Sequence, residues 1–207
     1  MSASTPSVSP DTPHVAAKPP GPRDLAVLGI AWLLMAAWPW VAPNDYVLSL
    51  GSTFFINLLL VASLNLLVGY AGQISLAHGA FFGLGAYASG ILSAKFGVSP
   101  WLGTIAALLV CPAVAAVVGL PTLRLRGHYL AMATLGLNAI LSVLFVGLVG
   151  LTGGPNGLSG VASYQLGPID LGAPAPFFFL AWAVGGIVML GLRNLLRSRA
   201  GRGLRAV

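Results

Sequence analysis

Apolar runs of membrane-spanning length recur along this chain and constrain its fold more than any other feature. Several of them reach roughly 18 residues or more, the length that an α-helix needs to cross the ~30 Å hydrocarbon core of a bilayer. Charged residues make up only 7% of the 207 residues, whereas a soluble domain carries about 25%. The sequence therefore predicts an all-α fold, a polytopic bundle of transmembrane helices.

The apolar runs predict about six spans. The first could be a secretory signal, but its length, its tryptophans and the lack of a cleavage site favour an uncleaved helix. Residues 1–24, rich in Ser, Thr, Pro and Ala, have almost nothing to bury, so we expect a disordered cytoplasmic segment there. The transmembrane domain is expected over 25–196, with spans at about 25–42, 47–68, 74–95, 100–120, 128–150 and 177–195.

The basic residues predict the orientation of these spans. With the N-terminus in the cytoplasm, the inner segments hold nine of the ten Lys and Arg residues, and only Lys95 lies outside. Asp45 and Asp170 both lie outside. This asymmetry follows the positive-inside rule, and a shift of the count by one helix would remove it. Topology thus explains the formal net charge of +6, and nucleic acid is not an expected partner.

A glycine-rich polar segment, residues 69–87, joins the second and third predicted spans. It contains Gln73, Ser75 and His78 together with five glycines. Lipid offers no water to an open backbone or to a polar side chain, so such a segment must be buried in protein or line a wet cavity. This is the first indication of a transport path rather than of a membrane anchor.

Uncharged polar side chains recur within the predicted spans, and on the fifth span three of them follow each other at intervals of four residues, which gives one slowly drifting stripe. They are explained either as interhelical hydrogen bonds, worth ~0.6 kcal/mol each, or as a mildly polar passage. We favour the passage for the set as a whole, although for His78 by itself a neutral ring buried against a carbonyl is favoured over a gating or proton role. The predicted path residues are Asn57, Asn65, Gln73, Ser75, His78, Thr134, Asn138 and Ser142.

No chemistry of catalysis or ion coupling is predicted for this chain. The predicted spans contain no Asp or Glu, which argues against transport driven by protons or sodium. A Walker-type phosphate-binding motif is absent from the sequence, so the energy for transport must come from another polypeptide. No paired nucleophile and base, metal cluster or cofactor motif is present, so an intramembrane enzyme is disfavoured. Cys111 is interpreted as a small packing residue.

Three segments in the chain are similar to the signature of one family. Residues 69–87 read Gly-Tyr-Ala-Gly-Gln-Ile-Ser-Leu-Ala-His-Gly-Ala-Phe-Phe-Gly-Leu-Gly-Ala-Tyr, and residues 151–158 read Leu-Thr-Gly-Gly-Pro-Asn-Gly-Leu. Between them, residues 121–135 read Pro-Thr-Leu-Arg-Leu-Arg-Gly-His-Tyr-Leu-Ala-Met-Ala-Thr-Leu. In this order, the three segments resemble the LivM-type permease subunit of branched-chain amino-acid ABC importers.

The last residues of the chain are similar to the start of a cytoplasmic loop that, in this family, meets the ATPase. The resemblance implies that residues 197–207 begin such a coupling loop. Its basic character also suits binding to anionic lipid. The candidate coupling residues are Arg199, Arg202 and Arg205.

The resemblance implies a subunit of a larger assembly in the bacterial inner (plasma) membrane. Such importers combine two related permeases, cytoplasmic ATPases and a periplasmic or extracellular solute-binding protein, and the loop 152–176 would face that binding protein. Related permeases carry urea or short amides, so the substrate stays open. Family members continue with further spans, so we expect this chain to be an N-terminal portion. A truncated membrane subunit that does not transport is the alternative of a different class.

Overall fold

The computed structural model describes residues 22–70, 72–73, 75–122 and 128–198, and the chain divides into two compact units, Met1–Ala37 and Trp38–Val207. The described part of the first unit is helix α1 (Pro22–Met35) and the turn that follows it. Most of the segment expected to be disordered lies outside the described residues, but α1 begins at Pro22. Proline suits the first position of a helix, where its missing N–H has no partner to lose.

The first predicted span, 25–42, is divided in the structure. Helix α1 ends at Met35, and the second unit opens with a separate short helix, α2 (Trp38–Val41). Pro39 explains the break, because it has no N–H to offer the carbonyl of Met35. The structure therefore divides this region between two helices, and a membrane span over 25–42 stays a prediction.

The second unit contains six further helices, one π-helical turn, one 3-10 turn and a small hairpin in the part of the chain that the structure describes. The elements are α3 (Asp45–Asn65), the π-helical turn η1 (Leu66–Tyr70), α4 (His78–Phe96), α5 (Pro100–Thr122), α6 (His128–Gly147), α7 (Val149–Thr152), the 3-10 turn η2 (Gly154–Asn156), β1 (Gln165–Leu166), β2 (Ile169–Asp170) and α8 (Pro174–Arg197).

Among the described residues, four helices are long and apolar enough to cross a membrane, namely those over Asp45–Gly69, Pro100–Leu120, His128–Gly147 and Pro174–Leu196. Helix α4 has the length but not the hydropathy, because it carries four glycines, His78 and Lys95. Side chains of α4 nevertheless pack directly on α5 and α6. We therefore place α4 in the same membrane layer, while the total of six spans and the cytoplasmic N-terminus stay predictions.

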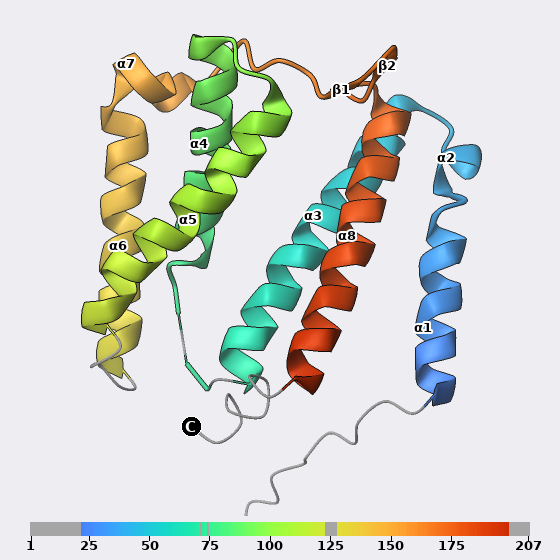
Figure 1. Cartoon of the computed structure of the whole chain (residues 1–207), viewed down its shortest axis with the longest axis horizontal. Coiled ribbons are helices and arrows are strands. Elements are labelled where there is room, and N and C mark those ends of the chain that lie inside the picture. Colours follow the sequence, from blue (N-terminus) through green and yellow to red (C-terminus); the bar gives the residue numbers. More distant parts are fainter. Residues whose placement is uncertain (1–21, 71, 74, 123–127, 199–207) are drawn as a thin grey trace, which may run out of the picture. The chain divides into compact units, whose positions relative to one another are not determined.

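Helices α3 and α8 form a parallel pair that is packed through aromatic rings (Figure 1). Phe55 and Phe178 are the largest fully buried side chains of the described residues, and their rings meet edge to face with centroids 5.4 Å apart. At Gly51 an added Cβ would lie 2.7 Å from the Phe178 ring, so the glycine makes room for it. This pair is therefore held by shape and by dispersion.

Helices α4 and α5 form an antiparallel pair that is packed through small residues. A Cβ on Gly103 of α5 would lie 2.9 Å from the backbone oxygen of Ser89 on α4. Further along, Gly85 faces the sulfur of Cys111, whose thiol lies 3.8 Å from the carbonyl oxygen of Phe81. Such close approach of two backbones is typical of membrane helices that carry small residues at their interface, and it agrees with the packing role predicted for Cys111.

The outer surfaces of these helices are strongly apolar. On α5, Leu108 and Val117 are 68% and 73% exposed. A water-soluble protein rarely exposes apolar patches of this extent, whereas lipid tails accept them at no cost. Together with the four membrane-spanning candidates, this surface identifies an all-α, polytopic membrane protein, which confirms the predicted fold class.

Candidate functional site

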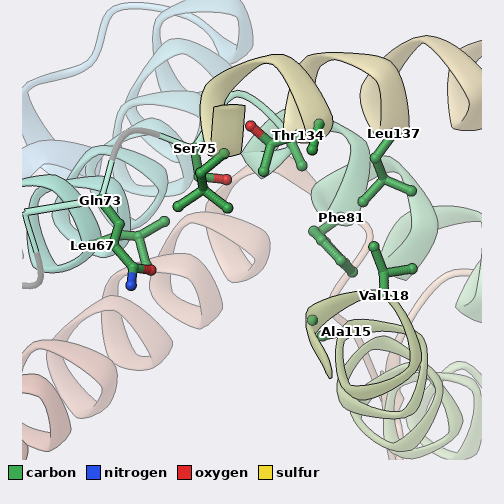
Figure 2. Close-up of a pocket in the computed structure, with 12 residues that line it drawn as sticks. Leu67, Gln73, Ser75, Phe81, Ala115, Val118, Thr134 and Leu137 are labelled. Carbon is green, nitrogen blue, oxygen red and sulfur yellow. The ribbon is translucent and has the colours of Figure 1, made fainter. Parts of the chain in front are cut away.

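A cavity of about 180 Å³ lies among η1, α4, α5 and α6. Figure 2 shows Gln73 and Ser75 at one side of it and Phe81 and Val118 at the other. The lining residues are mostly small or aliphatic, with three uncharged polar side chains among them. They are Leu67, Gln73, Ser75, Ala77, Phe81, Ala115, Val118, Gly119, Leu130, Ala133, Thr134 and Leu137.

Gln73 and Ser75 reach the cavity from a short non-helical stretch that we call the connecting segment, the described residues Gly72, Gln73, Ser75, Leu76 and Ala77. Gly72 has φ +62°, a left-handed conformation that glycine adopts without strain. The sequence predicted a third span from about residue 74, but α4 begins at His78. This non-helical backbone is accommodated between membrane helices because it lines a cavity in the protein rather than facing lipid.

Thr134 joins the connecting segment to α6. Its side chain is 9% exposed, and its hydroxyl donates a hydrogen bond to the carbonyl of Ala131 at 3.0 Å. The same oxygen accepts a hydrogen bond from the backbone N–H of Leu76 at 3.0 Å. Thr134 therefore satisfies one donor of a segment that has few backbone partners of its own, and it presents a hydroxyl beside the cavity.

His78 joins α4 to α3. Its Nε2 lies 2.7 Å from the hydroxyl oxygen of Ser63, in the last turn of α3. The Ser63 hydroxyl also lies 2.9 Å from the carbonyl oxygen of Leu60. His78 is not among the cavity-lining residues, so the structure connects it to helix packing rather than to the cavity itself.

The structure brings three of the eight predicted path residues to the cavity, namely Gln73, Ser75 and Thr134. The stripe on α6 turns away from it, because four residues advance the helix by somewhat more than one turn: Thr134 is buried, Asn138 is half-buried and Ser142 is exposed.

On α3 neither predicted asparagine lines the cavity. Asn57 is exposed and its side-chain amide donates to the carbonyl of Thr53 at 2.9 Å, within its own helix. Asn65 is exposed near the start of the π-helical turn. The candidate coupling residues Arg199, Arg202 and Arg205 lie outside the described residues.

Sequence reasoning missed the partner of His78 and the apolar walls of the cavity. The available signal for this pair was a hydroxyl within a predicted span, Ser63, that lies fifteen residues before the histidine. The apolar lining residues carry no signal of their own, because aliphatic residues are common throughout a membrane helix. Within the described part of the chain, no group of three or more His, Cys, Asp or Glu side chains lies together as metal ligands would.

The loop beyond α6 is tied to the α4–α5 turn by side-chain hydrogen bonds. The indole N–H of Trp101 donates to the carbonyl of Gln165 at 2.9 Å, and the hydroxyl oxygens of Thr104 and Tyr164 lie 2.8 Å apart. The Lys95 ammonium donates to the carbonyl of Gly150. Thr152 is buried and bonds to the carbonyl of Phe145 at 2.6 Å. This loop and hairpin were not predicted as an ordered structure, and they extend the α4–α5–α6 group at the end away from His78.

Comparisons with known proteins place this architecture in a family. Residues 46–207 match the permease component of the branched-chain amino acid transport system. The high-affinity branched-chain amino acid transport system permease protein LivM of Escherichia coli (strain K12) is 36% identical over 133 residues, which are 64% of this chain and 31% of that protein. The protein of the same name from Salmonella typhimurium (strain LT2) is 36% identical over 129 residues, 62% of this chain and 30% of its own. No solved structure matches.

The chain spans about a third of the length of the curated relatives it matches. The family match covers well over half of the chain, and it includes the connecting segment and all the residues that line the cavity. The resemblance seen in the three sequence segments is thereby confirmed. The chain belongs to the family of permease components of branched-chain amino acid transport systems.

Proposed function

We propose that this chain forms part of the permease subunit of an ABC importer for branched-chain or related amino acids in the bacterial inner membrane. The observation that carries the proposal is the cavity, which lies inside the family-matched region and combines aliphatic walls with three uncharged polar side chains. The permease proteins named LivM, which this chain resembles, belong to transport systems for branched-chain amino acids.

The chemistry of the cavity favours an aliphatic solute over a small polar one. Phe81, Val118, Leu130 and Leu137 give apolar walls that would contact a branched hydrocarbon side chain. Urea has no apolar part to place against these walls. Gln73, Ser75 and Thr134 can exchange hydrogen bonds with a passing solute without holding it by charge.

The other predicted path residues have a secondary place in this proposal. We propose that Asn138 and Ser142 continue the path along α6 beyond the cavity, and that Asn57 and Asn65 face it from α3. Each of these side chains is half-buried or exposed, so each is open to a solute or to a further helix. Their removal is expected to matter less than the removal of a cavity-lining group.

Partners would supply the energy and deliver the solute. The predicted orientation places the N-terminus and the arginine-rich end, with Arg199, Arg202 and Arg205, in the cytoplasm, where ATPase subunits would bind and where anionic lipid would be attracted. A second permease would complete the path, and a solute-binding protein would deliver the solute at the face that carries the hairpin β1–β2.

Uptake of labelled leucine, and separately of labelled urea, tests this function. The measurement uses cells in which the chromosomal locus is deleted and cells in which the intact locus is restored. We expect deletion to abolish the leucine uptake that depends on this locus, and restoration to return it. Loss of urea uptake alone would reassign the substrate, and loss of neither would favour a subunit that does not transport.

A further inference from the structure

The connecting segment carries two of the three polar side chains of the cavity, yet it belongs to no helix or strand. It follows a π-helical turn, Leu66–Tyr70, which is a poorly stabilised form of helix. Among its described residues, the backbone N–H of Gln73 bonds back to that turn, at the carbonyl of Leu67, at 3.3 Å. The placement of Gln73 and Ser75 therefore depends on contacts made by other residues.

Among the described residues, two side-chain hydrogen bonds connect this region to the helices around it. One is the bond from the N–H of Leu76 to the hydroxyl of Thr134 on α6. The other is the bond between His78, the first residue of α4, and Ser63, in the last turn of α3. The π-helical turn and the connecting segment run from the end of α3 to the start of α4. The second bond joins these two helix ends, so it fixes both ends of that stretch.

The direction of the His78 bond depends on the tautomer of the His78 ring. The Ser63 hydroxyl has one proton, and the nearby carbonyl of Leu60 can only accept a hydrogen bond. When that proton is directed to Leu60, the Ser63 oxygen accepts, and Nε2 of His78 is the donor. A side chain that offers an N–H at the same reach, such as glutamine, would preserve the contact, whereas alanine would remove it.

We propose that His78 is a positioning residue of the permease path. Through its bond to Ser63 it closes α4 onto the end of α3, and this holds the connecting segment so that Gln73 and Ser75 face the cavity. His78 itself does not contact the solute. The part of this inference that concerns transport rests on the proposed function, whereas the positioning of the segment does not.

The accessibility of position 75 to a thiol reagent tests the positioning. The reporter is Ser75→Cys in the intact full-length protein, with Cys111→Ala and with alanine at any cysteine outside these 207 residues. The probe is a charged methanethiosulfonate applied to membrane vesicles. We expect His78→Ala and Ser63→Ala each to raise the labelling rate by roughly threefold to tenfold, the range set by the loss of one interhelical hydrogen bond. The double variant should add little, and His78→Gln should label at nearly the original rate.

The native cysteine provides the matched control. Cys111 lies between α4 and α5, close to Gly85, so its labelling in a chain without the reporter measures whether α4 has loosened from α5. We expect His78→Ala to leave the labelling rate of Cys111 unchanged. Faster labelling of both positions, unchanged labelling at position 75, or a His78→Gln variant that behaves like His78→Ala would overturn the positioning role.

Leucine uptake separates this inference from the proposed function. We expect His78→Ala to lower uptake per molecule in the membrane and His78→Gln to retain it. Faster labelling at position 75 without any loss of uptake would support the positioning of the segment and contradict its place on the transport path.

Discussion

The α3–α8 pair and the α4–α5–α6 group are both helical and both membrane-embedded, but they are held together differently. In the α3–α8 pair the contact is made by large rings, with Phe178 packed against Phe55 and into the space left by Gly51. In the α4–α5–α6 group the α4–α5 contact is made by small residues, the rings of Tyr87 and Phe145 meet between α4 and α6, and a cavity with polar side chains lies beside them. Aromatic rings fill the contact of one pair, whereas a cavity of about 180 Å³ remains beside the helices of the other group.

The difference extends to the buried hydroxyls of the two regions. Ser52 in the α3–α8 pair is a buried hydroxyl, but it is bonded to the carbonyl of Leu48 within its own helix. Thr134 is equally buried, but it accepts a hydrogen bond from a different segment and lies beside the cavity. Both hydroxyls donate to a carbonyl of their own helix, but only that of Thr134 also joins its helix to another segment of the chain.

Truncation of Phe178 should have the largest effect on stability. Phe178→Ala removes a fully buried ring from the α3–α8 pair, and we expect a loss of about 3 kcal/mol in the free energy of unfolding, the lower end of the usual range because lipid can fill part of the space. Denaturation of the purified full-length protein in mixed micelles measures this. A change close to zero would mean that aromatic packing does not hold this pair.

Addition of one methyl group distinguishes the two interfaces further. Gly103→Ala would bring a Cβ to 2.9 Å from a backbone oxygen, whereas Gly51→Ala would meet the side chain of Phe178. A ring can move and a backbone cannot, so we expect Gly103→Ala to cost about 2 kcal/mol and Gly51→Ala about half of that. Gly136→Ala, with nothing within 4 Å, is the control and should be neutral. Equal costs at Gly103 and Gly51 would contradict the distinction.

Removal of amide groups outside the cavity should have the smallest effect. We expect Asn138→Leu, half-buried on α6, to reduce leucine uptake by about threefold, the equivalent of one interhelical polar contact. Asn57→Leu should reduce it less, because its amide is already bonded within α3. The measurement is uptake normalised to the amount of protein in the membrane. A larger loss of uptake in Asn57→Leu than in Asn138→Leu would indicate that the path lies nearer to α3.

Much of the helical architecture could be predicted from the sequence, because hydropathy alone defines segments that must bury their backbone in lipid. The spans predicted at 100–120 and 128–150 correspond to α5 and to α6 with α7, and the spans at 47–68 and 177–195 to α3 and α8. The break at Pro39 was missed because the apolar run continues across it. The hairpin at 165–170 was missed as well, although the Gly-Pro turn at its centre, with Gly167 at φ +62°, was a local signal.

The sequence predicted a site with uncharged polar side chains, but it predicted less well which residues line the cavity. Gln73 and Ser75 stand out because they interrupt an apolar sequence, and Thr134 because it begins a polar stripe. Periodicity could not reveal that the stripe leaves the cavity after Thr134, because that depends on how α6 is rotated against α4 and α5. Nor could it pair His78 with Ser63, because that contact depends on how the chain turns between two helices.

Leucine uptake by Thr134→Val and Ser52→Ala compares the two regions most directly. Each change removes one buried hydroxyl from one helix, and each variant is measured in the intact importer, with uptake divided by the amount of protein in the membrane. We expect Thr134→Val to lower uptake by about tenfold, since it removes a polar cavity group and leaves the N–H of Leu76 without its acceptor, and Ser52→Ala to leave uptake unchanged. Equal uptake by the two variants would contradict the assignment of the path to the α4–α5–α6 group.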